Sequence, residues 1–276
     1  MRIHTSVLLL AGIALTGAAG AVHAQAREEG RLLVAGQVLE ELRSGRDEVI
    51  PDRLLERAYG LAVIPDLTKV AFFAGGRRGH GVLVVRDHQG RFTSPVFVTM
   101  TGGSFGWQWG VQSADIVLVF TTPRGVEGIS GGKVTLGADA SVAAGPVGRQ
   151  ASAATDPTFK AEVYSYSRSR GAFAGLALDG TVISIDEDAD AAFYRKPGIS
   201  AADILAGSIT SDDDAARRFM TAVASSTGTQ RSASAAAGSP AAPAAPAAPT
   251  GAPAPASPAA AQSFPLSDPK PGSEPK

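Results

Sequence analysis

The spacing of hydrophobic residues changes at about residue 60. Before that point, apolar side chains recur every three or four positions, which predicts a helix with one apolar face. Gly45 is predicted to end this helix, and Pro51 to begin a second, shorter one. The apolar positions of the first helix are Leu32, Ala35, Val38, Leu39 and Leu42.

After residue 60 the pattern is one of short apolar runs separated by glycine and polar turns, which predicts β-strands. Asp87–Gly90 and Asp179–Gly180 are typical of the turns between such strands. Three short helices are predicted at 186–194, 201–206 and 212–224. The predicted strands are 61–64, 69–74, 82–86, 92–100, 116–121, 133–136, 161–167, 172–178 and 181–185.

Strands that are grouped, and do not alternate with helices, indicate an α+β fold. We expect a curved antiparallel sheet or partial β-barrel flanked by short helices. The globular part is predicted to span residues 50–225, preceded by a helix over 27–48.

The two ends of the chain have different compositions. Residues 1–24 have a charged start, an apolar centre and a small-residue ending, which is typical of a signal peptide. The apolar centre, at about 14 residues, is too short to cross a bilayer, which needs roughly 20. We therefore expect secretion across an inner membrane and a periplasmic location, with membrane association left open. The chain has no cysteine, so no lipid can be attached through sulfur.

Residues 231–276 consist mostly of alanine, proline, serine and glycine. Such a segment buries too little apolar surface to offset its ordering entropy, so we expect a disordered tail. The composition is compatible with a spacer, with a proline-rich ligand for a protein partner, or with a tether in the cell envelope.

Charge and motif spacing exclude several functions. The net charge is −1, without the basic excess typical of nucleic-acid binding. The segment 127–135 resembles a phosphate loop, but Glu127 replaces the first required glycine and Val134 follows the lysine. The segment 186–197 begins like an EF-hand, but it lacks the glycine at position 6 and the glutamate at position 12.

Catalytic chemistry has equally little support. After residue 24 the chain has only His80 and His88, both in predicted turns, and no GxSxG nucleophile motif. We therefore predict a protein that is not an enzyme, with no catalytic residues, no cofactor and no metal. Trp107 and Trp109 would share one face of a strand, either in the core or at a lipid or ligand boundary.

The remaining candidate site is the glycine-framed basic segment Gly75–Gly81. It is predicted to be a loop in which Arg77 and Arg78 offer bidentate contacts to phosphate, while glycine lets a ligand approach the backbone. An ordinary solvated turn is the alternative. The candidate phosphate-binding residues are Lys69, Arg77, Arg78, Gly79 and Gly81.

Several phrases of the chain, in order, resemble the SYLF family of lipid-binding domains, also called Ysc84 or DUF500. The resemblance extends over roughly residues 50–207, and Phe193-Tyr194 and Ile204-Leu205 complete it. Where the family typically has lysine, this chain has Tyr59. The matching phrases are 58–65 (AYGLAVIP), 75–81 (GGRRGHG), 102–106 (GGSFG), 136–148 (LGADASVAAGPVG) and 164–175 (YSYSRSRGAFAG).

The resemblance implies a non-enzymatic domain that binds phosphoinositides and membranes, with actin binding in fungal relatives. For an exported bacterial member it implies other anionic phospholipids, such as phosphatidylglycerol or cardiolipin. The helix over 27–48 would then be the amphipathic membrane segment, with Leu32, Leu39 and Leu42 facing the lipid. An envelope adaptor that uses its tail to bind proteins is the alternative.

Overall fold

The computed structural model describes residues 3–44, 50–145, 160–169 and 178–228. Within these ranges, the side chains of residues 3–22, 71–74, 104–112, 130 and 169 are not described. The chain divides into two units, Met1–Gly238 and Ser239–Lys276. The predicted disordered tail, 231–276, lies outside the described residues, and so does the predicted helix end at Gly45.

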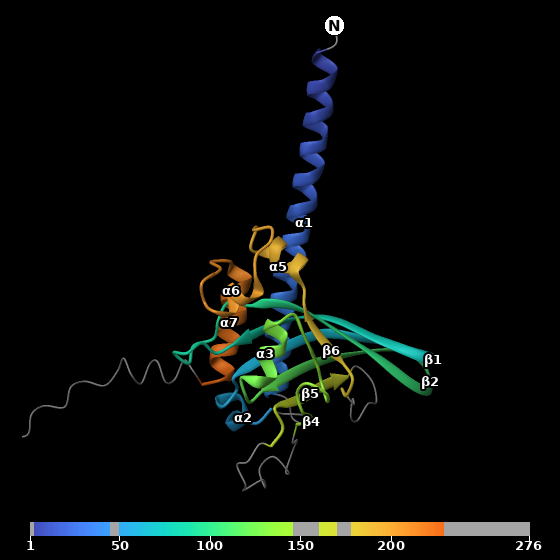
Figure 1. Ribbon diagram of the computed structural model, residues 1–276, viewed down its shortest axis with the longest axis vertical. Helices are drawn as coiled ribbons and strands as arrows, with labels where there is room; N and C mark the ends of the chain where they lie inside the picture. Colours follow the sequence, from blue (N-terminus) through green and yellow to red (C-terminus); the bar gives the residue numbers. More distant parts are fainter. Residues whose placement is uncertain (1–2, 45–49, 146–159, 170–177, 229–276) are drawn as a thin grey trace, which may run out of the picture. The chain divides into compact units, whose positions relative to one another are not determined.

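Two long strands organise the sheet. β1 (Gly60–Val85) pairs antiparallel with β2 (Val96–Phe120) from Gly60–Phe120 to Leu83–Val96. The turn at Asp87–Gly90 lies between them as predicted, with Gly90 in the left-handed region at φ 77°. Figure 1 shows this pair extending as one ribbon to the side of the sheet.

Within the described residues, four shorter strands complete a six-stranded sheet along the edge of β2 that β1 does not occupy. β6 (Val182–Ile185) pairs with one half of β2, and β3 (Lys133–Thr135) pairs with β6. β5 (Val163–Ser169) pairs with the other half, and β4 (Val142–Ala144) runs parallel to β5. The prediction of an α+β fold with a curved, mainly antiparallel sheet is confirmed. The strand predicted at 172–178 lies almost entirely outside the described residues.

The predicted loop at Gly75–Gly81 is wrong, because this segment lies within β1 and pairs with β2 from Ser104 to Val98. Two of its glycines, Gly79 and Gly81, are explained by close packing and not by turning. A Cβ on Gly81 would lie 2.4 Å from the carbonyl oxygen of Val63, and one on Gly79 would lie 2.7 Å from Cγ2 of Ile64. The two halves of β1 therefore approach each other so closely that only glycine fits.

In the part of the chain that the structure describes, six helices flank the sheet. α5 begins after the N-cap Asp186, whose side chain accepts a hydrogen bond from the amide of Ala189, and α6 and α7 are capped in the same way by Ser200 and Asp213. The sequence did not predict α3. The helices are α1 (Ile3–Ser44), α2 (Asp52–Glu56), α3 (Arg124–Ser130), α5 (Glu187–Phe193), α6 (Ala201–Leu205) and α7 (Asp214–Ser226).

The sheet is covered on both faces. The first core cluster joins the apolar side of α1 and the buried side of α7 to one face of the sheet. The second fills the opposite face, toward α3 and β3. Among the described residues, no helix is long and apolar enough to cross a membrane.

Candidate functional site

Arg77 and Arg78 point to opposite faces of β1, as successive residues in a strand must. Arg77 is only 8% exposed, and its Nη2 donates to the carbonyl oxygen of Gly103 at 3.2 Å. Burial lowers the pKa of Arg77, and nearby Asp179 partly opposes this. Arg78 is exposed. Because the two side chains leave β1 on opposite faces, their guanidinium groups cannot both contact one phosphate.

The other predicted phosphate ligands also lie apart from Arg78. Gly79 and Gly81 share the buried face with Arg77, and their Cβ positions are filled by the other half of β1. Lys69 lies farther along β1, opposite Gln112, is half-buried and has interaction partners of its own. Of the five predicted residues, only Arg78 is on an exposed surface with room for a ligand.

The register places Arg78 on a polar surface that spans four strands. One cross-strand row runs Arg78, Thr101, Val182, Thr135, and the next row runs His80, Thr99, Ser184, Lys133. Directly paired residues have side chains on the same face, so these rows share one surface. We call this surface the polar sheet face and define it by its polar members, which are Arg78, His80, Thr99, Thr101, Lys133, Thr135 and Ser184.

The polar sheet face combines positive charge with hydroxyl groups. Arg78 and Lys133 are exposed and lie on its outer strands, β1 and β3, while Thr101 and Ser184 lie between them, half-buried. Neighbouring strands are about 4.8 Å apart, so the distance from β1 to β3 is about 14 Å. Two cations at this separation, with hydroxyl groups between them, can hold an anionic and hydroxylated group without any catalytic residue.

His80 lies at the border of this face and not in a turn as predicted. Its Nδ1 is 3.2 Å from Oδ2 of Asp186 and 3.1 Å from Oγ1 of Thr99. Asp186 also lies 3.8 Å from Nη1 of Arg31, which comes from α1. His88, by contrast, is an exposed turn residue as predicted.

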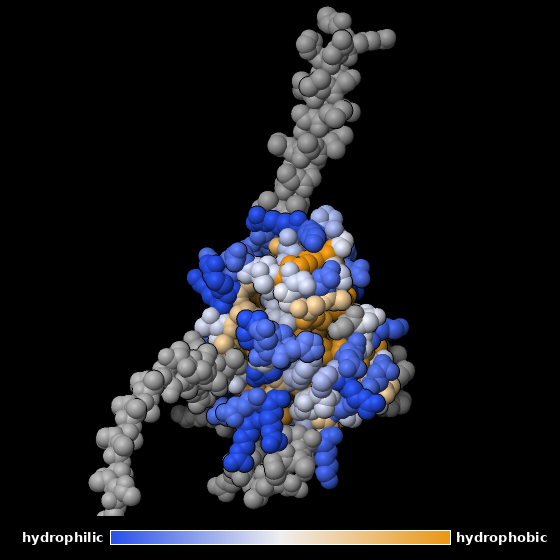
Figure 2. Space-filling view, turned by 60° about the vertical axis from the view of Figure 1, so that its left-hand side comes forward, coloured by the Kyte–Doolittle hydropathy of each residue, from blue (hydrophilic) through white to orange (hydrophobic). Residues whose placement is uncertain are grey.

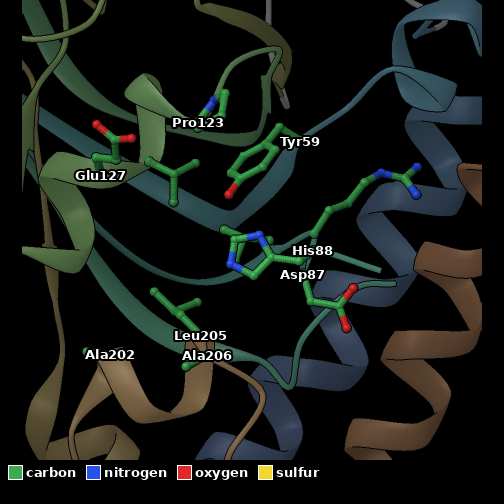
Figure 3. A pocket seen from close by; sticks show the side chains of 11 residues that line it. Tyr59, Asp87, His88, Pro123, Glu127, Ala202, Leu205 and Ala206 are labelled. Carbon is green, nitrogen blue, oxygen red and sulfur yellow. The ribbon is translucent and has the colours of Figure 1, made fainter. Parts of the chain in front are cut away.

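Outside the polar sheet face, a cavity of about 330 Å³ lies between the β1–β2 turn, α3 and α6. Tyr59 and His88 point into it, with Leu205 opposite (Figure 3). Arg86, another lining residue, is held by the carbonyl oxygens of Ala58, Gly90 and Glu56. The lining is otherwise mostly apolar, and its polar groups do not converge on a reacting position.

The described residues are not arranged as a metal site or as a phosphate loop. Among the described residues, no three His, Asp or Glu side chains are grouped to hold a metal ion. Asp186 caps α5, while Asp190 turns inward and accepts from the amide of Phe97 at 2.9 Å. Residues 127–135 form the end of α3 and strand β3, not a strand, loop and helix around phosphate. Trp107 and Trp109 lie in β2, where the side chains are not described.

The membrane-facing assignment of Leu32, Leu39 and Leu42 is wrong for this structure. Leu32 and Leu39 are 0% exposed and Leu42 is 2% exposed, and all three belong to the core shared with α7 and the sheet. Hydrophilic residues dominate the surface seen in Figure 2, with only small apolar areas. Among the described side chains, the exposed large hydrophobic residues are Leu33, Val34 and Val70.

The geometry thus defines a curved-sheet domain with a cationic, hydroxyl-rich face. Residues 101–226 match the family model described as "Ysc84: Las17-binding protein actin regulator". LAS seventeen-binding protein 3 of Saccharomyces cerevisiae is 39% identical over 168 residues, which is 60% of this chain and 36% of the relative. SH3 domain-containing YSC84-like protein 1 is 33% identical in Xenopus laevis, over 63% of this chain and 54% of the relative. In Homo sapiens it is 33% identical, over 63% and 52%.

Residues 101–226 therefore match the Ysc84 (SYLF) family, as the sequence phrases indicated. The chain spans between about a third and a half of the length of these relatives. Sequence reasoning missed Lys133 as a site residue, because this lysine stood out only within the rejected phosphate-loop pattern. The alternation of polar and apolar residues over Lys133, Val134 and Thr135 could indicate that Lys133 occupies an exposed position of a strand. It could not indicate which strand lies next to this one.

Proposed function

We propose that this protein binds anionic phospholipid headgroups at a membrane surface through the polar sheet face and catalyses no reaction. Arg78 and Lys133 would contact the phosphate charge, and Thr101 and Ser184 would accept or donate hydrogen bonds to headgroup oxygens. The observation that carries the proposal is the pairing register, which brings two exposed cations and a set of hydroxyl groups onto one face. Both types of group are suited to phosphate.

The mode of binding we propose is peripheral and electrostatic. The apolar side of α1 is used in the core, so binding through this face does not require the helix to insert. We further propose that residues 1–24 direct export and that the protein works in the periplasm, where phosphatidylglycerol or cardiolipin would supply the anionic headgroup.

Vesicle co-sedimentation tests this proposal. Wild type should bind vesicles containing phosphatidylglycerol in preference to vesicles of phosphatidylcholine alone. The double variant Arg78→Ala/Lys133→Ala should lose about 2 kcal/mol of binding free energy, a roughly 30-fold drop, at about 1 kcal/mol for each cation near the surface. A variant with the same charge change elsewhere, Arg53→Ala/Arg218→Ala, is the matched control, since both arginines are exposed and lie on α2 and α7. Equal losses in the two variants would contradict a site at the polar sheet face.

A second candidate function is that of an adaptor in the cell envelope, with the proline- and alanine-rich tail binding a protein. The observation in its favour is that the descriptions of the family and of the yeast relative name the binding of a protein, Las17. A chain shortened at residue 229 should then lose a co-purifying partner while its vesicle binding is unchanged. Loss of vesicle binding without loss of a partner would count against the adaptor.

A further inference from the structure

A group of carboxylates is buried between α1, α5 and the sheet. Glu28 of α1 and Asp190 of α5 are both 0% exposed, and the side chain of Asp186 is 19% exposed. Two arginines of α1 pair with Glu28: Nη1 of Arg31, whose side chain is 12% exposed, lies 2.8 Å from its Oε2, and Nε of the exposed Arg27 lies 2.9 Å from its Oε1. The guanidinium carbon of Arg31 also lies 5.5 Å from the centre of the Phe97 ring. The group joins α1 to α5 and β2 through charge as well as through apolar packing.

Asp190 is the least compensated member of this group. Its Oδ1 accepts a hydrogen bond from the backbone amide of Phe97 at 2.9 Å. Its Oδ2 is buried and has no hydrogen-bond partner among the described residues. A buried carboxylate oxygen without a donor is costly, whereas a protonated carboxyl at the same place carries no net charge to solvate.

The charges that face Asp190 make its ionised form less favourable still. Glu28 faces it from α1, and Asp186 and Glu187 from its own helix and cap. Oδ2 of Asp186 lies 3.8 Å from Nη1 of Arg31 in α1 and 3.2 Å from Nδ1 of His80 in β1, and Arg27 of α1 pairs with Glu28. Tyr194, at the end of α5, donates its hydroxyl to the carbonyl oxygen of Pro95. Burial raises the pKa of Asp190 to about 7. The hydrogen bond from the amide of Phe97 opposes this rise, and the charges of Asp186, Glu187 and Glu28 add to it.

We propose that Asp190 acts as a proton-operated latch for α1. While the Asp190 carboxyl is neutral, α1 stays packed against α5 and β2, which is the seated form. When the carboxyl ionises, α1 loosens from them, which is the released form. The cluster then holds three carboxylates against the mostly buried guanidinium of Arg31 and the exposed guanidinium of Arg27, and movement of Glu28 away with α1 relieves the repulsion. The proposal stands apart from headgroup binding at the polar sheet face, because none of its carboxylates belongs to that face.

The direction of the pH dependence follows from proton linkage. The pKa of Asp190 is raised in the folded protein, from 3.8 to about 7, so the seated form takes up a proton that the released form does not hold between these values. The stabilisation is therefore complete below about pH 4, is lost as pH rises toward 7, and changes no further above about pH 8. Within that window the equilibrium constant for release should rise about tenfold for each pH unit.

Hydrogen exchange of the α1 amides, corrected for the intrinsic rate at each pH, measures the release. In wild type, protection of residues 32–42 should fall about tenfold per pH unit between pH 5 and 7 and then level off. Asp190→Asn keeps an oxygen for the amide of Phe97 and replaces the ionisable oxygen by a neutral donor, so its α1 protection should not depend on pH in this way. Asp188→Asn, an exposed acid on the same helix, is the matched control and should behave as wild type.

Persistence of the wild-type pH dependence in Asp190→Asn would overturn the proposal, because another group would then be responsible. Should Asp190→Asn fail to fold, the carboxyl carbon of Asp190 can be titrated by NMR in the wild-type protein. A carboxyl that is still protonated at pH 6 agrees with the latch, and one that is already ionised at pH 5 refutes it.

Discussion

The roles of single residues in this protein depend on which face of a strand they occupy. Arg77 and Arg78 are adjacent and chemically identical, yet one is buried beneath the sheet and the other is exposed on the polar sheet face. The glycines beside them differ in the same way. Gly81 has no room for a side chain, whereas a Cβ on Gly103 of the paired strand would meet nothing within 4 Å.

Replacing Gly81 by alanine should therefore destabilise the protein by about 1–3 kcal/mol, because the new methyl group must displace the backbone of the other half of β1. Urea unfolding followed by circular dichroism measures the change. Gly103→Ala is the control and should cost well under about 1 kcal/mol. If the two variants lose the same stability, the close approach of the two halves of β1 is not the reason for glycine at position 81.

At the scale of elements, α1 is a core helix over the part whose side chains are described. Its buried residues pack against α7 at Gly36, where an added Cβ would lie 3.7 Å from Cβ of Ala222 and 3.7 Å from Cα of Phe219. Arg168 of β5 adds a polar link, pairing with both Glu41 of α1 and the buried Asp115 of β2. These contacts explain why an amphipathic pattern need not indicate a membrane-facing helix.

A matched pair of leucine variants on α1 distinguishes core packing from membrane contact. Leu39→Ala should lower the free energy of unfolding in solution by about 2–5 kcal/mol, since Leu39 is 0% exposed. Leu33→Ala, on the same helix but 43% exposed, should cost less than about 1 kcal/mol. A membrane-facing Leu39 would give the opposite result, with normal stability in solution and weaker vesicle binding.

At the scale of the molecule, its charges decide how it can meet an anionic surface. The whole chain has a net charge of −1, so attraction must come from a local surface and not from a general positive field. The polar sheet face has Arg78 and Lys133 as exposed cations, while Asp186, the acid at its border, is already engaged by His80 and Thr99.

Binding to anionic vesicles should therefore weaken steeply with salt. The Debye length falls from about 10 Å at 0.1 M to about 3 Å at 1 M, which screens contacts at an exposed face. Co-sedimentation of wild type at both concentrations measures the effect, and the Arg78→Ala/Lys133→Ala variant should show a smaller salt dependence. Salt-independent binding would point to insertion of apolar groups in place of headgroup contact.

Much of the local structure could be predicted from the sequence, because its causes are local. Ser200 caps α6 and Gly180 adopts a positive φ in the turn before β6, both from short-range chemistry. The Ysc84 phrases were sufficient to indicate the family. The candidate site was harder to predict, and of its seven polar members only Arg78 was expected to bind phosphate.

The sequence by itself determined where the chain forms most of its strands and helices, which residues of one strand share a face, and that its phosphate-loop and EF-hand patterns are incomplete. Only the tertiary structure decided that Gly75–Gly81 continues a strand, that Leu32 and Leu39 belong to the core, and that Lys133 shares a surface with Arg78. The physical reason is that alternation and helical periodicity describe one element at a time. Which element covers an apolar face, and which strands lie side by side and in what register, is set by packing between residues that are far apart in the sequence.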